Sequence, residues 1–374
     1  MTESASTLSG RYPGDARDGR AKASQTKLLS LEFGRFVAAL LVVCFHFAFG
    51  FFNLRQDGQF LWLFRAGHAG VDYFFVLSGF IIYHVHRADL GRPERLRGFA
   101  IKRFIRLYPM YWLIFLTMIL LVLVSGSLGA HYDLSPGPRV LDGLLLPFDG
   151  DPLLGQSWTL RNEIVFYAVF AAAILNVRLG IILFLLWQCL SLASVSMGPL
   201  SGYAKPFLSI FNVGFAAGMA VAWLSDRITL PRPGWIALLG IAGILVCMTV
   251  EAWIGHDIPA EFLPLGEATS PLLYIGFASL TVLGMTGWER SGTLPFPALL
   301  SLLGGCSYVL YLVHGILISI LIRLFAITPL DAIPHALAFL LMIAISIAAA
   351  IAMHLYIEKP VMARLRARLL PRSN

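Results

Sequence analysis

Apolar runs long enough to cross a lipid bilayer dominate this sequence. A helix of about 20 residues spans the hydrocarbon core. Because lipid cannot hydrogen-bond to exposed backbone, each run is expected to be a helix. The ten runs, separated by Pro/Gly-rich or charged segments, are 36–52, 68–84, 107–125, 158–175, 179–194, 206–224, 235–253, 271–287, 306–325 and 335–357. The sequence therefore predicts an all-α integral membrane protein, a bundle of about ten transmembrane helices.

Composition excludes two other classes of protein. Of the 374 residues, 58% are hydrophobic and 13% are charged, whereas a soluble domain has about 45–50% apolar and about 25% charged residues. A compact water-soluble enzyme is excluded, because so much apolar surface would not fit inside a core. The four cysteines are too few for a secreted disulfide scaffold and have no metal-ligand spacing, so no metal site is expected.

The basic residues predict the orientation and the domain limits. Lys and Arg accumulate in cytoplasmic loops. With the N-terminus in the cytoplasm, 22 of the 28 Lys and Arg residues fall on the inner side and six on the outer side. The net charge of +7 then reflects a positive inner face and does not indicate binding to nucleic acid. Both termini are expected in the cytoplasm. We expect a disordered tail over 1–30, a membrane domain over 31–360 and a basic tail over 361–374.

Ionisable side chains inside membrane helices are costly and are therefore candidates for function. Arg35 and His46 are eleven residues apart, which places them on nearly one helical face with His46 roughly 16 Å deeper. Arg35 is expected at the inner edge and His46 beyond the middle of the membrane. His46 fits two roles about equally well: a structural histidine bonded to a carbonyl, or a general base that activates a hydroxyl.

The second run begins with another polar pair. His68 and Asp72 are four residues apart and share a helical face near the outer surface. Asp72 is a stronger functional candidate than the small residues further along this run. Ser78 and Gly79, further along this run, are small residues that favour close packing of helices.

Two arginines precede the apolar part of the third run. Arg103 and Arg106 are three residues apart, so both face one way at the inner interface. They fit a simple positive-inside anchor, which is the commoner role of such loops. They also fit an anion site, because the guanidinium group binds phosphate well.

The fourth run opens from the outer side with Ser157 and Trp158, and Glu163 follows about 7 Å further down. Glu163 is at a depth comparable to that of His46, so the two side chains could meet. A carboxylate there would orient the imidazole and stabilise its charged form. The alternative is that Glu163 pairs with Arg161 or with another cation.

The last two runs also carry polar residues. Ser307, Tyr311 and His314 fall within about 60° of one another on the ninth helix. A single histidine there would more often be a satisfied core residue, but a stripe of three favours a lined path. His354 and the segment 358–360 are expected mainly to mark the inner end of the last run.

Together these motifs resemble the acyltransferase-3 family of bacterial inner-membrane enzymes, which O-acylate surface polysaccharides. The single-domain form is similar to acetyltransferases of exopolysaccharide synthesis, including the succinoglycan type. Tyr73 stands where this family often has Leu. The matching features, spread from about residue 29 to 368, are Arg35 with His46, the run Gly70 to Phe80, Arg103 and Arg106 before Tyr-Pro, Ser157-Trp158 with Glu163, the stripe ending at His314, and Glu358-Lys359-Pro360.

The resemblance implies a donor and an acceptor. An acyl-CoA, usually acetyl-CoA, arrives from the cytoplasm as a substrate, with no permanently bound cofactor. A hydroxyl of a polysaccharide or of a lipid-linked glycan accepts the acyl group. The expected roles are catalysis by His46 and Glu163, donor binding by Arg35, Arg103 and Arg106, a path or oxyanion site at Ser307, Tyr311 and His314, and an acceptor side at Asp72, Ser157 and Trp158.

Other functions remain compatible with these residues. Intramembrane His and Glu residues can relay protons in a multi-span transporter, although the chain shows no inverted repeat and no paired broken helices. A non-catalytic membrane partner in polysaccharide export is a third possibility. Within the acyltransferase interpretation, acetyl and succinyl donors both fit, as do direct transfer and transfer through an acylated His46.

Overall fold

The structure is a computed structural model that describes residues 28–55, 58–124, 154–197, 204–254, 269–292, 298–327 and 333–370. The predicted tail over 1–30 lies almost entirely outside the described residues. Helix α2 already begins at Leu29, within that predicted tail.

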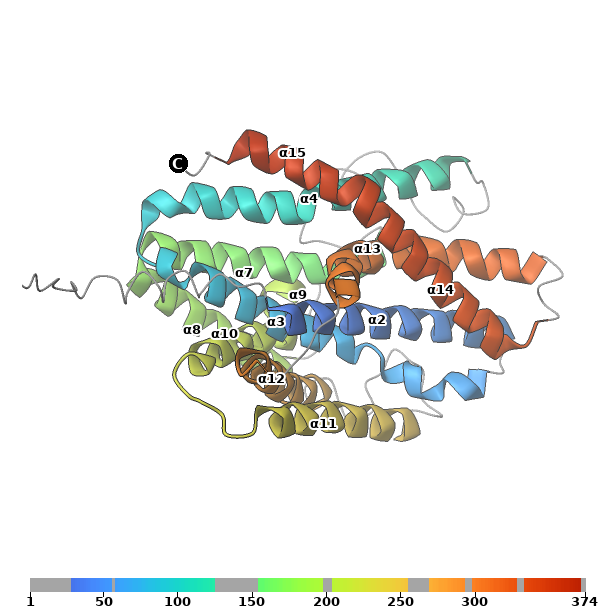
Figure 1. Ribbon diagram of the computed structural model, residues 1–374, viewed down its shortest axis with the longest axis horizontal. Coiled ribbons are helices and arrows are strands. Elements are labelled where there is room, and N and C mark those ends of the chain that lie inside the picture. The colour runs from blue at the N-terminus through green and yellow to red at the C-terminus, as the bar shows by residue number, and fades with distance from the viewer. Residues whose placement is uncertain are drawn as a thin grey trace, which may run out of the picture.

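The described residues form a helical bundle without strands (Figure 1). Within them, ten helical segments are long and apolar enough to cross a membrane, which confirms the predicted fold class. The longer helices are α2 (Leu29–Arg55), α3 (Ala69–His86), α4 (Leu96–Val124), α7 (Trp158–Leu175), α8 (Val177–Ala193), α10 (Val213–Ser225), α11 (Pro233–Ile254), α12 (Thr269–Arg290), α13 (Ala298–Ile327), α14 (His335–Met353) and α15 (Lys359–Leu369).

Two helices begin well before the apolar runs that predict them. Helix α4 starts at Leu96 instead of residue 107, and α13 starts at Ala298 instead of residue 306. Hydropathy marks only the part of a helix that meets lipid, whereas a helix satisfies its own backbone in any solvent. The extra turns of α4 matter for function, because they carry Arg103 and Arg106.

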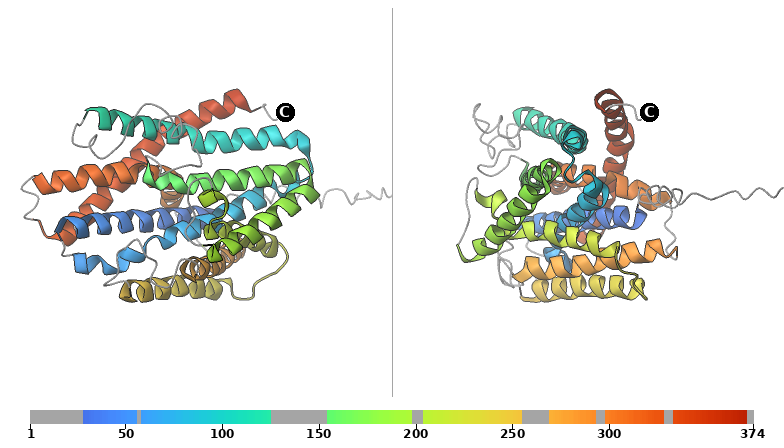
Figure 2. Two further views of the ribbon diagram at one scale, coloured as in Figure 1. Left: turned by 180° about the vertical axis from the view of Figure 1, so that it is seen from behind. Right: turned by 90° about the vertical axis from the view of Figure 1, so that its left-hand side faces the viewer.

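Helices α2 and α3 lie at the centre of the bundle. Helix α2 packs against α3 and α13, α3 packs against α10, and α11 pairs with α12. The views in Figure 2 show the pair α11 and α12 on one side of the bundle and α4 on the other. Polar residues of α3 and α13 such as Asp72, Ser307 and His314 are therefore held in the interior.

Glycines allow α3 and α10 to approach closely. A Cβ atom at Gly218 would collide with the carbonyl oxygen of Val76, and one at Gly79 would collide with the carbonyl oxygen of Phe215. Small residues at such crossings let helix backbones come together in a membrane. Gly79 thus has the packing role expected from the sequence.

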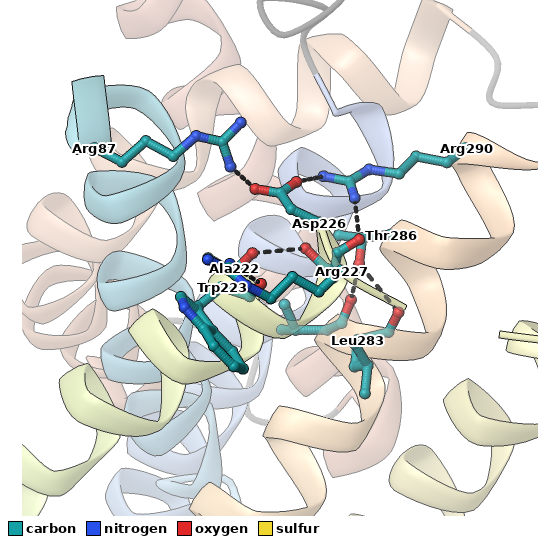
Figure 3. Close-up of polar contacts among 10 residues, drawn as sticks. Arg87, Ala222, Trp223, Asp226, Arg227, Leu283, Thr286 and Arg290 are labelled. Atoms are coloured by element: carbon teal, nitrogen blue, oxygen red, sulfur yellow. Dashed lines mark hydrogen bonds and ion pairs between the residues drawn. The ribbon is translucent and has the colours of Figure 1, made fainter. Parts of the chain in front are cut away.

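Ion pairs join three helices at one end of the bundle. Asp226, just after α10, lies between Arg87, which follows α3, and Arg290 at the end of α12 (Figure 3). Arg290 Nη2 is 3.1 Å from Asp226 Oδ1, and its Nη1 donates to the carbonyl of Ser225 over 2.5 Å. We call this the basic end, defined by Arg87, Arg290 and the arginines of α4 that lie near it.

The start of α2 is fixed at the same end. The first backbone amides of a helix have no partner within the helix. Here the carboxylate of Glu289, from α12, accepts hydrogen bonds from the amides of Leu29 over 2.7 Å and of Ser30 over 2.9 Å. An acid at this position also complements the positive end of the helix dipole.

The chain ends in a second, basic helix. Helix α14 passes through a π-helical turn, His354–Glu358, into α15, which lies beside α4 (Figure 1). The segment expected to be a basic tail over 361–374 is therefore helical as far as Leu369, and residues 371–374 lie outside the described part. π turns are uncommon and often occur at functional sites.

We predict that Gly218→Ala destabilises the protein by about 1–3 kcal/mol, because the added methyl group forces α3 and α10 apart. Thermal unfolding of the purified protein in detergent measures the effect as a lower Tm. The matched control is Gly276→Ala in α12, where a Cβ meets nothing within 4 Å and Ala favours the helix by about 0.5–1 kcal/mol. Equal shifts of Tm in the two variants would contradict the assigned packing.

Candidate functional site

A cavity of about 380 Å³ lies between α2, α3, α4, α7, α13 and α15. Its acidic lining residue, within the described chain, is Glu163. Its basic lining residues come from α2, α4 and α15 and are Arg35, Lys102, Arg103, Arg106 and Arg366. The three arginines predicted to bind phosphate thus share one cavity, and two further cations join them. Such an excess of positive charge suits an anionic ligand.

Arg103 is held from several sides. Its guanidinium carbon lies 5.8 Å from the ring centroid of Phe99 and 5.7 Å from that of Tyr167. Its Nη2 is 3.4 Å from Nε2 of the buried His86, whose Nδ1 is 2.7 Å from Asp89 Oδ2. Because Arg only donates, His86 accepts at Nε2 and donates from Nδ1 to Asp89. These contacts fix the direction of the Arg103 side chain.

Arg106 is shared between the cavity and the C-terminal segment. Its guanidinium lies 4.7 Å from the ring centroid of Tyr308, and its Nη1 donates to Glu358 over 3.3 Å. Glu358 is buried and also contacts His354 Nδ1 at 2.6 Å. The segment expected mainly to mark the end of the last span therefore has a further role, which is to anchor a cavity arginine.

Glu163 has different partners from those expected. Its carboxylate accepts hydrogen bonds from Ser78 Oγ, over 3.1 Å, and from the Tyr167 hydroxyl. Among the described residues it makes no hydrogen bond with His46 and no ion pair with Arg161. Depth alone suggested the contact with His46, but α7 packs against α4 and α3, so Glu163 faces α3 while His46 lies against α13.

His46 and His314 form a pair of imidazoles. Their ring centroids are 4.8 Å apart, with a tilt of 56° between the planes. Nδ1 of His46 lies 2.8 Å from the carbonyl of Val42, and Nδ1 of His314 lies 2.5 Å from the carbonyl of Tyr311. A carbonyl only accepts, so each Nδ1 carries a proton and each Nε2 is the basic nitrogen. Nε2 of His314 is buried without a hydrogen-bond partner among the described residues.

Tyr311 connects the cavity to this histidine pair. Tyr311 lines the cavity, and its hydroxyl lies 2.8 Å from Thr159 Oγ1 and donates to the carbonyl of Gln156 over 3.0 Å. Its backbone carbonyl is the one that holds His314. Ser307, the third member of the predicted stripe, donates instead to a carbonyl of its own helix and does not line the cavity.

The three predicted acceptor-side residues are distributed through the bundle. Ser157 and Asp72 are buried, and neither oxygen of Asp72 has a hydrogen-bond partner among the described residues. Trp158 packs among aromatic side chains, 6.2 Å from the ring of Phe75 and 5.3 Å from that of Phe211. The indole is thus part of the bundle packing.

Asp72 belongs to a cluster that sequence reasoning missed. Glu251, at the end of α11, is buried beside Asp72. Its carboxylate accepts from Ser270 over 2.9 Å and from Tyr274 over 2.5 Å, and it pairs with His68 Nε2 at 3.2 Å. A carboxylate inside an otherwise apolar run is the signal that could have identified Glu251.

Other lining residues were also missed. Lys102 is four residues before Arg106, and that spacing alone places it on the same helical face. Ser78, expected only to permit packing, binds Glu163 instead. Arg366 gave no local signal, because its part in the cavity depends on how α15 docks onto α4.

The cavity thus holds five cations near the basic end and reaches Tyr311. Neither His46 nor His314 lines it, but the ring centroid of Tyr311 lies 5.7 Å from that of His314. Guanidinium and ammonium groups bind phosphates, and an imidazole with a free Nε2 can take a proton from a hydroxyl. The arrangement suits a phosphorylated substrate whose reactive end lies deep in the membrane.

Comparison with known proteins agrees with this chemistry. The family model of an acyltransferase domain matches residues 28–355. The chain is 29% identical to "Exopolysaccharide production protein ExoZ" of Rhizobium meliloti over 333 residues, which is 82% of this chain and 92% of that protein. It is 27% identical to "Acyltransferase MdmB" of Streptomyces mycarofaciens over 383 aligned positions, covering 91% and 93% of the two chains.

A third relative is shorter. "Protein 2 in picA locus" of Rhizobium radiobacter is 32% identical over 164 residues, which is 39% of this chain and 81% of that protein. No solved structure matches the chain. Since the family model covers nearly the whole membrane domain, this multi-pass membrane protein belongs to the acyltransferase-3 family.

Proposed function

We propose that the protein is an O-acyltransferase that moves an acyl group, acetyl in the first instance, from acyl-CoA to a hydroxyl of an exopolysaccharide or of its lipid-linked precursor. It acts in the bacterial inner membrane, with the basic end toward the cytoplasm. The observation that carries the proposal is a cavity that holds five cations and reaches Tyr311, whose ring centroid lies 5.7 Å from that of His314. The name of the Rhizobium meliloti relative supports an exopolysaccharide acceptor.

The donor enters from the basic end. Its phosphates meet Arg35, Arg103 and Arg106, and its pantetheine arm extends along the cavity beside Ser78 and Thr159. Arg suits this task, because its fork of donors stays charged and matches phosphate oxygens. The thioester then reaches the Tyr311 end, next to the histidine pair.

Transfer takes place near His46. The acceptor oxygen attacks the thioester carbonyl while Nε2 of His46 takes the hydroxyl proton. The hydroxyl groups of Tyr311 and Thr159 turn their protons from the Gln156 carbonyl to the negative oxygen of the tetrahedral intermediate and stabilise it. The C–S bond then breaks, and the proton passes from His46 to the departing thiolate, which leaves as free CoA. The imidazole of His314 packs against that of His46. Ser307 is buried in α13, the helix that carries His314.

Glu163 acts in this scheme as a positioning residue. Its bond to the Tyr167 hydroxyl fixes the ring above which Arg103 lies. Glu163 thus orients a phosphate-binding arginine. In this mechanism it does not act on His46.

The acceptor approaches from the end opposite the basic end. Asp72, in the first turn of α3, and Glu251, near the end of α11, lie toward that end. Ser157 and Trp158 are packed within the bundle, and Asp72 is buried there with neither carboxylate oxygen bonded to a described residue, so only an acceptor that enters the bundle would meet it.

We expect His46→Ala to lower acyl transfer by about 10²–10⁴-fold, because the general base is removed. Purified protein is incubated with labelled acetyl-CoA and the glycan, and released CoA and labelled glycan are measured. The control His335→Ala removes a membrane histidine outside the site and should keep full activity. Transfer at the wild-type level by a correctly inserted His46→Ala protein would contradict the base role.

Uptake of label into vesicles without transfer would indicate a transporter.

The double variant Arg103→Ala with Arg106→Ala should raise the KM for acetyl-CoA at least about tenfold, because two charge-assisted phosphate contacts are lost. Turnover at saturating donor should fall much less. Steady-state kinetics with varied donor measure both quantities. Arg178→Ala, which removes an exposed cation of α8 outside the cavity, is the control. An unchanged KM in the double variant would refute the phosphate site.

Glu163→Gln decides between the two roles considered for this residue. If Glu163 orients Tyr167 and Arg103, the KM for acetyl-CoA should rise several-fold while kcat changes less. If it acts on His46, kcat should fall steeply at unchanged KM. Tyr167→Phe, which removes the hydroxyl that Glu163 binds, should reproduce the first pattern and provides the matched comparison.

A further inference from the structure

We propose that the C-terminal helix α15 is a specificity element, in which Arg366, together with Lys102 of α4, binds the ribose 3′-phosphate of the CoA donor. The inference rests on the proposed function and extends it, because it names the part of the donor that the outermost cations recognise. The protein should then prefer CoA thioesters to donors that lack this phosphate.

The face that α15 turns to the bundle is defined by its sequence spacing. Met362 and Arg366 are four residues apart, which places them on one side of the helix, and Leu370 directly follows its last residue. Met362 is buried, and Arg366 and Leu370 both line the cavity. Arg364 and Arg368 are each two positions from Arg366, about 200° around the helix, and neither lines the cavity.

The position of α15 is fixed at its start. The buried Glu358, in the π turn before α15, binds both Arg106 and His354. Helix α15 then continues along α4 (Figure 1). Arg366 lines the same cavity as Lys102. The packing of α15 on α4 and the ion pair between Glu358 and Arg106 therefore fix the position of Arg366. From the sequence alone, this segment is expected to be a basic tail.

The five cations of the cavity differ in burial. Arg35, Arg103 and Arg106 are partly buried, and the last two already have His86 and Glu358 as partners. Lys102 and Arg366 are exposed, and neither forms an ion pair with a described residue. The exposed pair therefore marks the mouth of the cavity.

The order of the chemical groups along the donor matches the order of the cavity cations from partly buried to exposed. In acetyl-CoA the thioester is at one end of the pantetheine arm, the diphosphate is at the other, and the 3′-phosphate is on the ribose beyond it. With the thioester near Tyr311, the diphosphate lies among the partly buried arginines and the 3′-phosphate lies at the mouth. A phosphate monoester carries a charge of about −1.5 to −2 near pH 7, which two exposed cations complement.

The test compares acetyl-CoA with acetyl-3′-dephospho-CoA as donors for the wild type, Arg366→Gln and Arg364→Gln. The wild type should prefer acetyl-CoA by about tenfold in kcat/KM, as expected for loss of a charge-assisted contact. Arg366→Gln should raise the KM for acetyl-CoA several-fold, leave that for the dephospho donor unchanged, and so remove the preference. Arg364→Gln loses the same charge on the opposite face and should keep it.

Binding to the same proteins gives a readout that does not need turnover. Adenosine 3′,5′-bisphosphate should raise the Tm of the wild type more than AMP does, and this difference should disappear in Arg366→Gln alone. The inference is overturned if Arg366→Gln affects both donors equally, if Arg364→Gln behaves in the same way, or if the wild type does not distinguish the two nucleotides. A wild type that transfers from neither donor, but still distinguishes them in binding, overturns the proposed function and leaves the phosphate site in place.

Discussion

Lipid offers no hydrogen bonds, so a polar side chain inside this bundle must find its partners within the protein. That constraint accounts for the contacts on which the candidate site depends. Glu163 is satisfied by Ser78 and Tyr167, and the two imidazoles donate to carbonyls of their own helices. Each of these bonds fixes a side chain in one direction, so the need to satisfy polar groups also preorganises the cavity.

The same constraint explains how the cavity keeps its positive charge. Its cations stay close to the basic end, where Arg side chains can reach water, and the more buried ones are supported by neutral or aromatic neighbours. Arg103 lies against Phe99, Tyr167 and His86, and these groups hold its direction without neutralising it. Arg106 has a carboxylate partner, Glu358, which the structure links to α15. The cavity and the C-terminal segment thus meet at one arginine.

The sequence predicted the parts of this structure that depend on local pattern. Hydropathy located the helices, and the spacing of Arg103 and Arg106 predicted that both face one way, and both line the cavity. Predictions that required the packing of distant helices were less successful. Glu163 and His46 are at similar depth, but a helix has several faces, and depth does not determine which neighbour a side chain meets. The sequence assigns Arg366 to a basic tail, because only the docking of α15 onto α4 brings it to the cavity.

The partners of His46 bear on how the proposed transfer proceeds. In a triad, a carboxylate stabilises the imidazolium that forms when the base takes a proton. Among the described residues His46 has no such partner; it has a carbonyl on Nδ1 and a second imidazole beside it. A charged imidazolium is costly in a low-dielectric interior. The proton should therefore move on to the departing sulfur within the same encounter, which favours direct transfer to the acceptor over a long-lived acylated His46.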